Sequence, residues 1–410
     1  MKFSIGSNQN KIIIPTIVLF LSACTDSKSN PDAKVEGVFQ AAISAVSSDF
    51  GSSEISIANG LLADDPGTPD LDESLNSYNV ANGFAAQDLS DITVASYGKS
   101  FYRLGRSSQN NITKFNFETP ELDEWQFSVN DEGSSVASNP QDVIFVSEQK
   151  AYVLRYGSDS ILIINPSVAA NDEDGFKIGT IDLSAYNDPA QTVPFMRAAV
   201  LNDGKLYVVM QVMDGDWVPG IAKLAIIDIT TDEELLTSNI SLTVKNPIDL
   251  DVLGNYLYVS GIGRYANSWS TPPTPAEYTG GIEKINLNNL SSELLVDDGD
   301  GTEQPYGQIN GLALISESLG YFRGYSAWAN ESIFQFNPST GIVDSEPVIG
   351  FDGADIRALT ESPDQELWVG MVADSNPVIK VINPTDNSLI SEIFTSKIPS
   401  EIVFSGNLAE

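Results

Sequence analysis

The chain of 410 residues contains no histidine and a single cysteine. Histidine is the most frequent general base of enzymes and a frequent metal ligand, so its absence removes the Ser-His-Asp triad and every imidazole metal site. These absences predict that the protein is not an enzyme. A hydrolase or lyase that works with carboxylates alone is the remaining catalytic alternative, since acidic residues number 56.

Basic residues are also scarce. The 21 Lys and Arg residues are far outnumbered by Asp and Glu, which gives a formal net charge of −35. Such a charge repels the phosphate backbone of DNA and RNA, so a nucleic-acid partner is excluded. The simplest role of the acidic surface is to keep the protein soluble.

The N-terminal region lacks a hydrophobic run long enough to span a bilayer. Its apolar stretch extends only from Ile12 to Leu21, behind the positive flank of Lys2 and Lys11. A run of this length and placement is typical of the central part of a secretory signal peptide.

The residues that follow, Leu21-Ser22-Ala23-Cys24, resemble the lipobox of bacterial lipoproteins. The resemblance implies that residues 1–23 are a signal peptide, that Cys24 is lipidated, and that residues 24–36 are a flexible tether. Because Thr25 rather than Asp follows the cysteine, it also implies anchoring in the outer membrane of a Gram-negative bacterium. Whether the protein faces the periplasm or the outside stays open.

The clearest feature that is present is a repeat. Seven times an Ile or Leu is followed, four positions later, by Asn or Asp, with 46 to 63 residues between successive copies. This spacing is typical of β-propeller blades, each of which is a small antiparallel sheet. The copies are Ile55–Asn59, Ile112–Asn116, Ile161–Asn165, Leu224–Asp228, Ile282–Asn286, Ile333–Asn337 and Ile379–Asn383.

Each copy is the third strand of a predicted four-stranded blade. The closing Asn or Asp side chain can accept a hydrogen bond from the backbone two residues later, which ends the strand in a turn. A strand with an aromatic residue lies about twenty residues upstream in six units, for example around Tyr152 and Tyr258, and a more apolar strand precedes it. A weaker fourth strand follows the turn, as in residues 124–129 and 388–394.

The two ends of the sequence supply the seventh blade. Residues 41–50 and 52–60 read as its second and third strands, and residues 400–406 read as its first. Pairing them would close the ring and leave no open sheet edge at its centre. The fold class is therefore an all-β, seven-bladed propeller over residues 37–410, with 61–88 as an irregular connection. An open β-sandwich or two separate β domains is the alternative.

All seven arginines are expected on one face, conventionally called the top, where the loops between the second and third strands lie. An acidic protein that gathers guanidinium groups on one face is suited to an anionic or carbonyl-rich ligand. The alternative is that each arginine pairs with a nearby carboxylate. The seven are Arg103, Arg106, Arg155, Arg197, Arg264, Arg323 and Arg357, and the predicted ligand-binding residues among them are Arg197, Arg264, Arg323 and Arg357.

Aromatic residues are expected in the same top loops of three consecutive units. Exposed aromatics beside arginine form an interaction surface, although they can instead pack on one another as a loop core. The predicted ligand-binding aromatics are Trp217, Tyr265, Trp269, Tyr306, Tyr325 and Trp328.

Two further polar groups are weaker candidates. The strand register places a mixed ring at the mouth of the central channel, made of Asp91, Asp142, Arg197, Asp249, Gly311, Arg357 and Glu401. The run Asp297 to Gly301 has calcium-loop character, with Asp298 and Asp300 as the candidate ligands. It lacks the terminal bidentate Glu of a full calcium loop, so a solvated turn is the alternative and no cofactor is required.

The lipobox, the seven units and the binding face together resemble the YncE-like β-propellers. More narrowly, they resemble surface lipoprotein propellers that capture cobalamin or siderophores and hand them to a TonB-dependent transporter. The resemblance implies a ligand-binding protein with such a transporter as partner. A protein-interaction scaffold or adhesin using the same face is the alternative, and a propeller lyase or hydrolase is the third.

Overall fold

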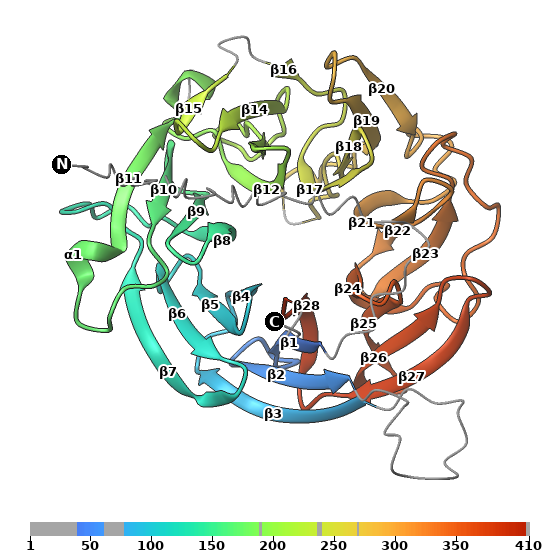
Figure 1. The fold of residues 1–410 in the computed structure, drawn as a ribbon. Coiled ribbons are helices and arrows are strands. Elements are labelled where there is room, and N and C mark those ends of the chain that lie inside the picture. The colour runs from blue at the N-terminus through green and yellow to red at the C-terminus, as the bar shows by residue number, and fades with distance from the viewer. Residues whose placement is uncertain (1–38, 61–77, 188–190, 236–239, 269, 407–410) are drawn as a thin grey trace, which may run out of the picture. The chain divides into compact units, whose positions relative to one another are not determined.

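A computed structural model describes residues 39–60, 78–187, 191–235, 240–268 and 270–406. The predicted signal peptide, Cys24 and Trp269 lie outside these residues. The strands of the described residues form seven antiparallel sheets arranged in a ring (Figure 1). The fold is the predicted seven-bladed β-propeller. In the described part of the chain, no helix is long and apolar enough to cross a membrane.

The first three blades each contain four strands, with the first-named strand nearest the centre of the ring (Figure 1). Blade 1 has β28 (Ile398–Phe404), β1 (Gln40–Val46), β2 (Ser53–Gly60) and β3 (Tyr78–Gln87); blade 2 has β4 (Ile92–Tyr97), β5 (Ser100–Gly105), β6 (Asn111–Asn116) and β7 (Thr119–Ser128); blade 3 has β8 (Pro140–Ser147), β9 (Lys150–Arg155), β10 (Ser160–Ile164) and β11 (Lys177–Asp182). The short helix α1 (Glu173–Phe176) precedes β11, and the 3-10 turn η1 (Ser184–Tyr186) follows it.

The other four blades are built in the same order. Blade 4 has β12 (Met196–Asn202), β13 (Lys205–Met210), β14 (Lys223–Asp228) and two short strands, β15 (Glu233–Glu234) and β16 (Ile240–Ser241); blade 5 has β17 (Pro247–Leu253), β18 (Tyr256–Gly261), β19 (Gly281–Asn286) and β20 (Ser292–Val296); blade 6 has β21 (Gln308–Ser316), β22 (Leu319–Ala327) and β23 (Asn330–Phe336); blade 7 has β24 (Asp355–Glu361), β25 (Leu367–Ala373), β26 (Asn376–Asn383) and β27 (Ser388–Phe394).

Two details of the predicted blades were wrong. Blade 6 has three strands, and an irregular segment replaces the fourth, joined to β23 by the isolated bridge between Phe336 and Val343. Pro347 cannot donate to a strand ladder, and Gly341 and Gly350 adopt positive φ angles, so this segment turns rather than extends. The predicted irregular connection 61–88 ends in β3, whose mostly small and polar residues, none of them buried, gave only a weak strand signal.

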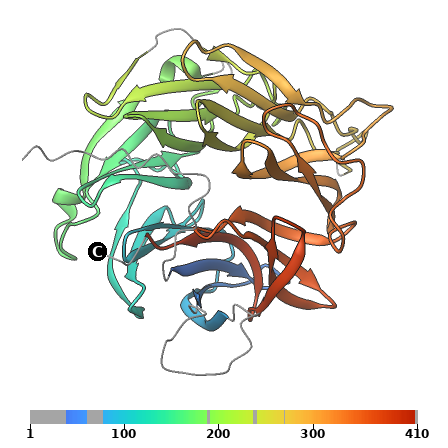
Figure 2. The ribbon, with the colours of Figure 1, turned by 45° about the vertical axis from the view of Figure 1, so that its right-hand side comes forward.

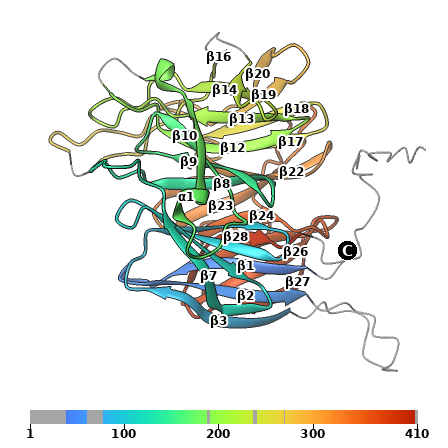
Figure 3. The ribbon, with the colours of Figure 1, turned by 60° about the vertical axis from the view of Figure 1, so that its left-hand side comes forward.

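Closure of the ring by the two ends of the chain is confirmed. β28 pairs antiparallel with β1, with Ile402 opposite Ile43 and Phe404 opposite Ala41. Figure 3 shows the four strands of blade 1 side by side, and Figure 2 shows the blue and red ends of the colour scale meeting there. Hydrogen bonds reinforce the seam, since the Ser405 hydroxyl accepts from the Gln40 backbone N–H at 2.9 Å. The innermost sheet edge is therefore paired rather than open.

The repeated Asn and Asp residues form the turns that the sequence predicts. In six blades the side-chain oxygen accepts a hydrogen bond from the backbone N–H two residues later, at 2.7 to 3.0 Å. Tyrosines on the second strand of a blade donate hydrogen bonds to these turns in the next blade. The Tyr258 hydroxyl donates to the Pro338 carbonyl, and Tyr321 donates to Asn387 of the following blade. The repeat therefore joins neighbouring blades as well as ending each strand.

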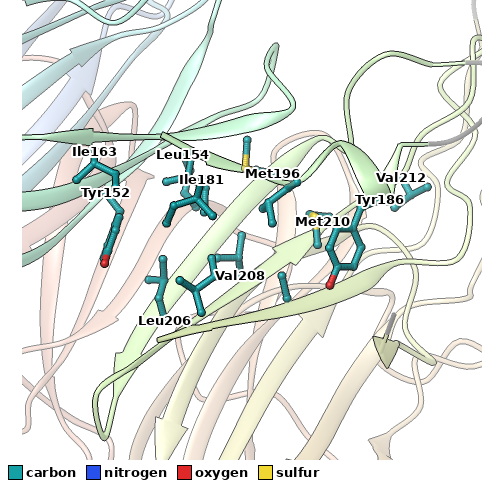
Figure 4. Close-up of a cluster of buried hydrophobic side chains, with 14 residues drawn as sticks. Tyr152, Leu154, Ile163, Ile181, Tyr186, Met196, Leu206, Val208, Met210 and Val212 are labelled. Atoms are coloured by element: carbon teal, nitrogen blue, oxygen red, sulfur yellow. The ribbon is translucent and has the colours of Figure 1, made fainter. Parts of the chain in front are cut away.

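Hydrophobic residues fill the spaces between blades. In the described residues each cluster of buried apolar side chains combines two neighbouring sheets, and seven clusters serve the seven interfaces. Figure 4 shows the cluster between blades 3 and 4, where Tyr152 and Leu154 of β9 face Leu206 and Val208 of β13. The centre of the ring is left for polar side chains.

Candidate functional site

A β-bulge marks the innermost strand of six of the described blades, near the strand's N-terminal end. In β12, Met196 pairs with Met210 and Ala198 with Val209, so Arg197 between them has no partner. In β24, Arg357 is skipped in the same way. A bulge bends the strand and changes the direction of the unpaired side chain. The other bulges lie at Gln141, Ile248, Asn310 with Gly311, and Ser400.

These bulged residues line a cavity of about 860 Å³. Its walls come from the innermost strands of all seven blades, and six of the seven residues of the predicted ring line it. The exception is Asp91, which pairs with Arg106 at 3.4 Å and accepts hydrogen bonds from Ser107. Four arginines reach the cavity, namely Arg106, Arg197, Arg323 and Arg357.

Arg106 and Arg197 share one acceptor. The side-chain oxygen of Gln141 accepts from Arg106 Nη2 at 2.7 Å and from Arg197 Nη1 at 3.2 Å. The Gln141 amide in turn donates to the backbone carbonyl of Asn139, which fixes its orientation. Burial lowers the pKa of Arg106, and the positive charge of Arg197 lowers it further. Two guanidinium groups are thus held together by a neutral amide.

Arg323 and Asp249 meet at Gly311. A Cβ atom at position 311 would lie 3.6 Å from Arg323 Nε and 3.8 Å from Asp249 Oδ2, so the glycine keeps the space between them clear. Its φ of +93° is one that other residues rarely adopt. Arg323 Nε donates to the Asn310 carbonyl at 2.7 Å, and Asp249 accepts from the Leu312 N–H at 3.2 Å. Both side chains are therefore fixed at the cavity wall.

Three carboxyl groups complete the wall. Burial raises the pKa of Glu401 to about 7; the charge of Asp249 raises it further, whereas Arg197 opposes the shift. Burial likewise raises the pKa of Asp142 to about 6 and raises the pKa of Asp249. Although protein atoms surround Glu401, its side chain is in contact with the cavity and is accessible to water. A carboxyl group that titrates near pH 7 can accept or donate a proton under neutral conditions.

Predicted aromatics line the cavity or contact residues of its wall, since Trp217 stacks on Tyr156 and Trp328 lies against Arg357. Tyr265 lines the cavity and meets Tyr325 edge-on, with ring centroids 4.7 Å apart. Trp217 and Trp328 are 63% and 62% exposed. Tyr306 is elsewhere, because it packs on Phe322 and Phe334 in the core between blades 5 and 6.

Three arginines of the predicted set have local structural roles. Arg264 pairs with Glu277 across its own loop, and the two residues form an isolated β-bridge. Arg155 is fully buried, where it donates to the Val129 carbonyl and to Asp131. Arg103 donates to Thr113 and Gln126. Arg264 and Arg155 thus pair with a nearby carboxylate, as the alternative states, whereas Arg103 is held by uncharged partners.

The two carboxylates of the candidate calcium loop lie in different environments. The Asp300 side chain is held at the surface by hydrogen bonds from Thr302 and Glu303, which lower its pKa to about 2. Asp298 is fully buried, and burial raises its pKa to about 7. In the described residues, no group of three or more His, Cys, Asp or Glu side chains is placed to hold a metal ion.

The polar residues that connect the arginines were not predicted from the sequence. Gln141, Gln211 and Tyr156 all line the cavity, and the Tyr156 hydroxyl donates to Gln211 at 2.7 Å. Glu401 was placed in the ring but was not proposed for ligand binding. The strand register could have indicated Gln141 and Ser400, because each directly precedes a residue of the predicted ring, Asp142 or Glu401.

No protein-family model matches the chain, and no curated protein is similar to it in sequence. Solved structures do match. A putative 6-phosphogluconolactonase from Bacteroides uniformis is 14% identical, with a TM-score of 0.56 over 90% of this chain and 100% of that one. The periplasmic gluconolactonase PpgL from Pseudomonas aeruginosa is 12% identical, with a TM-score of 0.55 over 90% and 99%. A putative 6-phosphogluconolactonase from Bacteroides fragilis is 10% identical, with a TM-score of 0.54 over 91% and 99%.

At these identities the likeness establishes the propeller fold alone. The prediction that the protein is not an enzyme is contradicted, because propellers of this fold include proteins described as lactonases and the fold is therefore compatible with catalysis. The prediction failed because it treated histidine as the main source of a group that titrates near neutral pH. Here the protein raises the pKa of Glu401 to about 7 without any histidine.

Proposed function

We propose that the cavity binds a small, anionic, hydroxyl-rich ligand of the sugar-acid class and hydrolyses its lactone or a similar ester. The observation that supports this most is the pair of guanidinium groups on Gln141. Among the described residues, no carboxylate oxygen lies within 4.0 Å of the Arg197 nitrogens, whereas Arg106 pairs with Asp91. Arg197 can therefore bind the carboxylate of the sugar acid, and in the lactone it faces the carbonyl oxygen that becomes this carboxylate.

The carboxyl groups suit the hydrolytic step. Deprotonated Glu401 removes a proton from water, and the hydroxide adds to the lactone carbonyl. The guanidinium groups stabilise the negative oxygen that forms. The ring C–O bond then breaks, Glu401 returns the proton to the departing oxygen, and the product is the open-chain hydroxy acid. Water supplies every atom added, so no cofactor is consumed.

Binding of gluconate and hydrolysis of δ-gluconolactone test this proposal. Calorimetry measures gluconate binding, and acid release at constant pH measures hydrolysis above the buffer rate. Arg197→Gln should weaken gluconate binding about tenfold or more, because a hydrogen bond to a charged group contributes roughly 1.5 to 3 kcal/mol. Lys99→Gln is the control, since it removes the same charge from an exposed surface pair.

Two outcomes would contradict the proposal. If the wild-type protein neither binds gluconate nor accelerates lactone hydrolysis, the ligand class is wrong. If Arg197→Gln binds gluconate as tightly as Lys99→Gln does, the ligand lies elsewhere.

We also propose that the propeller is anchored in the outer membrane through Cys24 and passes its ligand or product to a TonB-dependent transporter. Support comes from the lipobox-like residues 21–24 and from the resemblance to capture propellers. A cobalamin or siderophore is a second candidate ligand, favoured by the exposed rings of Trp217 and Trp328, on which a large planar group could stack.

Replacing Cys24 tests the anchor. Cys24→Ser removes the thiol that accepts lipid, so the protein should move from the membrane fraction to the soluble fraction of fractionated cells. Ser22→Ala serves as the control, because it leaves the cysteine in place. A Cys24→Ser variant that stays in the membrane fraction would rule out lipidation at this residue.

A further inference from the structure

Two aromatic platforms flank the cavity on opposite sides of the ring. The first platform consists of Tyr156, Phe195 and Trp217, at the top of blades 3 and 4. The second platform consists of Phe50, Trp328 and Arg357, contributed by blades 1, 6 and 7. Blade 2 separates the platforms on one side of the ring and blade 5 on the other (Figure 1).

The first platform is a stack that ends in the cavity. The ring of Trp217 lies parallel to that of Tyr156, with an interplanar angle of 3° and centroids 6.5 Å apart, and Phe195 supports both. Tyr156 belongs to the cavity wall and is fixed by its hydrogen bond to Gln211. Trp217 remains 63% exposed, although burying its large apolar ring would be favourable.

The second platform is built in the same way around an arginine. Arg357 Cζ lies 4.0 Å from the centroid of the Trp328 ring, and the guanidinium also pairs with Asp355 at 2.5 Å. Phe50 meets Trp328 with centroids 5.9 Å apart and planes inclined by 60°. The β25–β26 turn of blade 7 is short, so the loops of blades 1 and 6 meet above it. Both aromatic rings are at least half exposed.

We infer that the ligand is an acidic oligosaccharide, in which one sugar acid occupies the cavity and neighbouring rings stack on the platforms. This inference rests on the proposed function. Each platform continues a wall of the cavity outward, so a chain leaving the cavity would meet an exposed tryptophan. The C–H faces of a sugar ring are apolar and pack on an indole ring, while its hydroxyl groups stay in water. Arg197 in the cavity selects for the carboxylate of the sugar acid bound there.

Comparison of galacturonic acid with its trimer tests this inference. By calorimetry the trimer should bind the wild-type protein about tenfold more tightly than the monomer, because a stacked ring adds contact area. Trp328→Ala or Trp217→Ala should reduce this advantage while changing monomer affinity less than about twofold. Trp328→Phe keeps an aromatic face and should restore most of the advantage. Phe394→Ala removes an exposed ring from the outer strand β27 and serves as the control.

The outcomes separate this inference from the proposed function. If monomer and trimer bind equally well, or if neither binds although gluconate does, the platforms are not sugar subsites and the cavity proposal stands. If a neutral trimer such as maltotriose binds as tightly as the acidic one, the ligand is not acidic. If gluconate and both uronates fail to bind, the proposed function itself fails.

Discussion

Deleting residues 399–410 is expected to leave a chain that cannot form a stable propeller. The deletion removes nearly all of β28, the innermost strand of blade 1 and the only described partner of the inner edge of β1. Ile402 is 3% exposed, and Phe404 packs edge-on against Phe39 and Trp368 with centroids about 5 Å away. Losing two such side chains costs roughly 2 to 5 kcal/mol each, against a typical total of about 5 to 15 kcal/mol.

Thermal unfolding and analytical gel filtration measure this effect. The truncated chain should lack a cooperative melting transition or elute as aggregates, because the edge of β1 and the face of Trp368 become exposed. A shorter deletion of residues 407–410 keeps β28 and provides the control. A melting temperature unchanged by the longer deletion would show that closure does not depend on this strand.

The fold was predictable because its signals are local and repeated. A turn that forms at Asn165 forms again at Asn337 and Asn383 for the same reason, namely the acceptor oxygen of a short side chain. Blade 6 broke the pattern where Pro347 prevents a fourth strand, and β3 formed where the sequence shows almost no strand preference. In β3, pairing with β2 outweighs local propensity.

The site was only partly predictable, because its geometry depends on β-bulges whose positions no sequence pattern indicates. Register alone placed Arg197 and Arg357 at the cavity, but it could not show that each lies at a bulge, opposite no residue of the neighbouring strand. Arg264 and Arg155 carry the same charge but do not line the cavity, and they pair with Glu277 and Asp131 instead. Arg197 and Arg357 reach the cavity because each lies at a bulge of an innermost strand, which the sequence does not show.

Replacing Glu401 with glutamine is expected to reduce lactone hydrolysis at pH 7 by about a hundredfold or more, the range typical for loss of a general base. Gluconate binding should persist or strengthen, because a negative charge leaves a site that binds an anion. In the wild-type protein, hydrolysis should fall as the pH drops below about 7, where Glu401 becomes protonated. Glu392→Gln, which changes a carboxylate on the outer strand β27, should leave the rate unchanged.

Glu401→Gln is expected to lower the rate of hydrolysis but to raise the stability of the folded protein. The raised pKa of Glu401 can therefore be tested without substrate. Burial raises the pKa of Glu401 in the folded state to about 7, above the value of about 4.3 expected in the unfolded chain. The folded state therefore holds this proton more tightly, and the resulting stability is present at low pH and is lost as the pH rises toward 7. Glu401→Gln should consequently melt at a higher temperature than the wild type at pH 8, and the difference should shrink toward pH 5. A variant that is less stable than the wild type at pH 8, with an unchanged rate of hydrolysis, would show that Glu401 is an ordinary structural carboxylate.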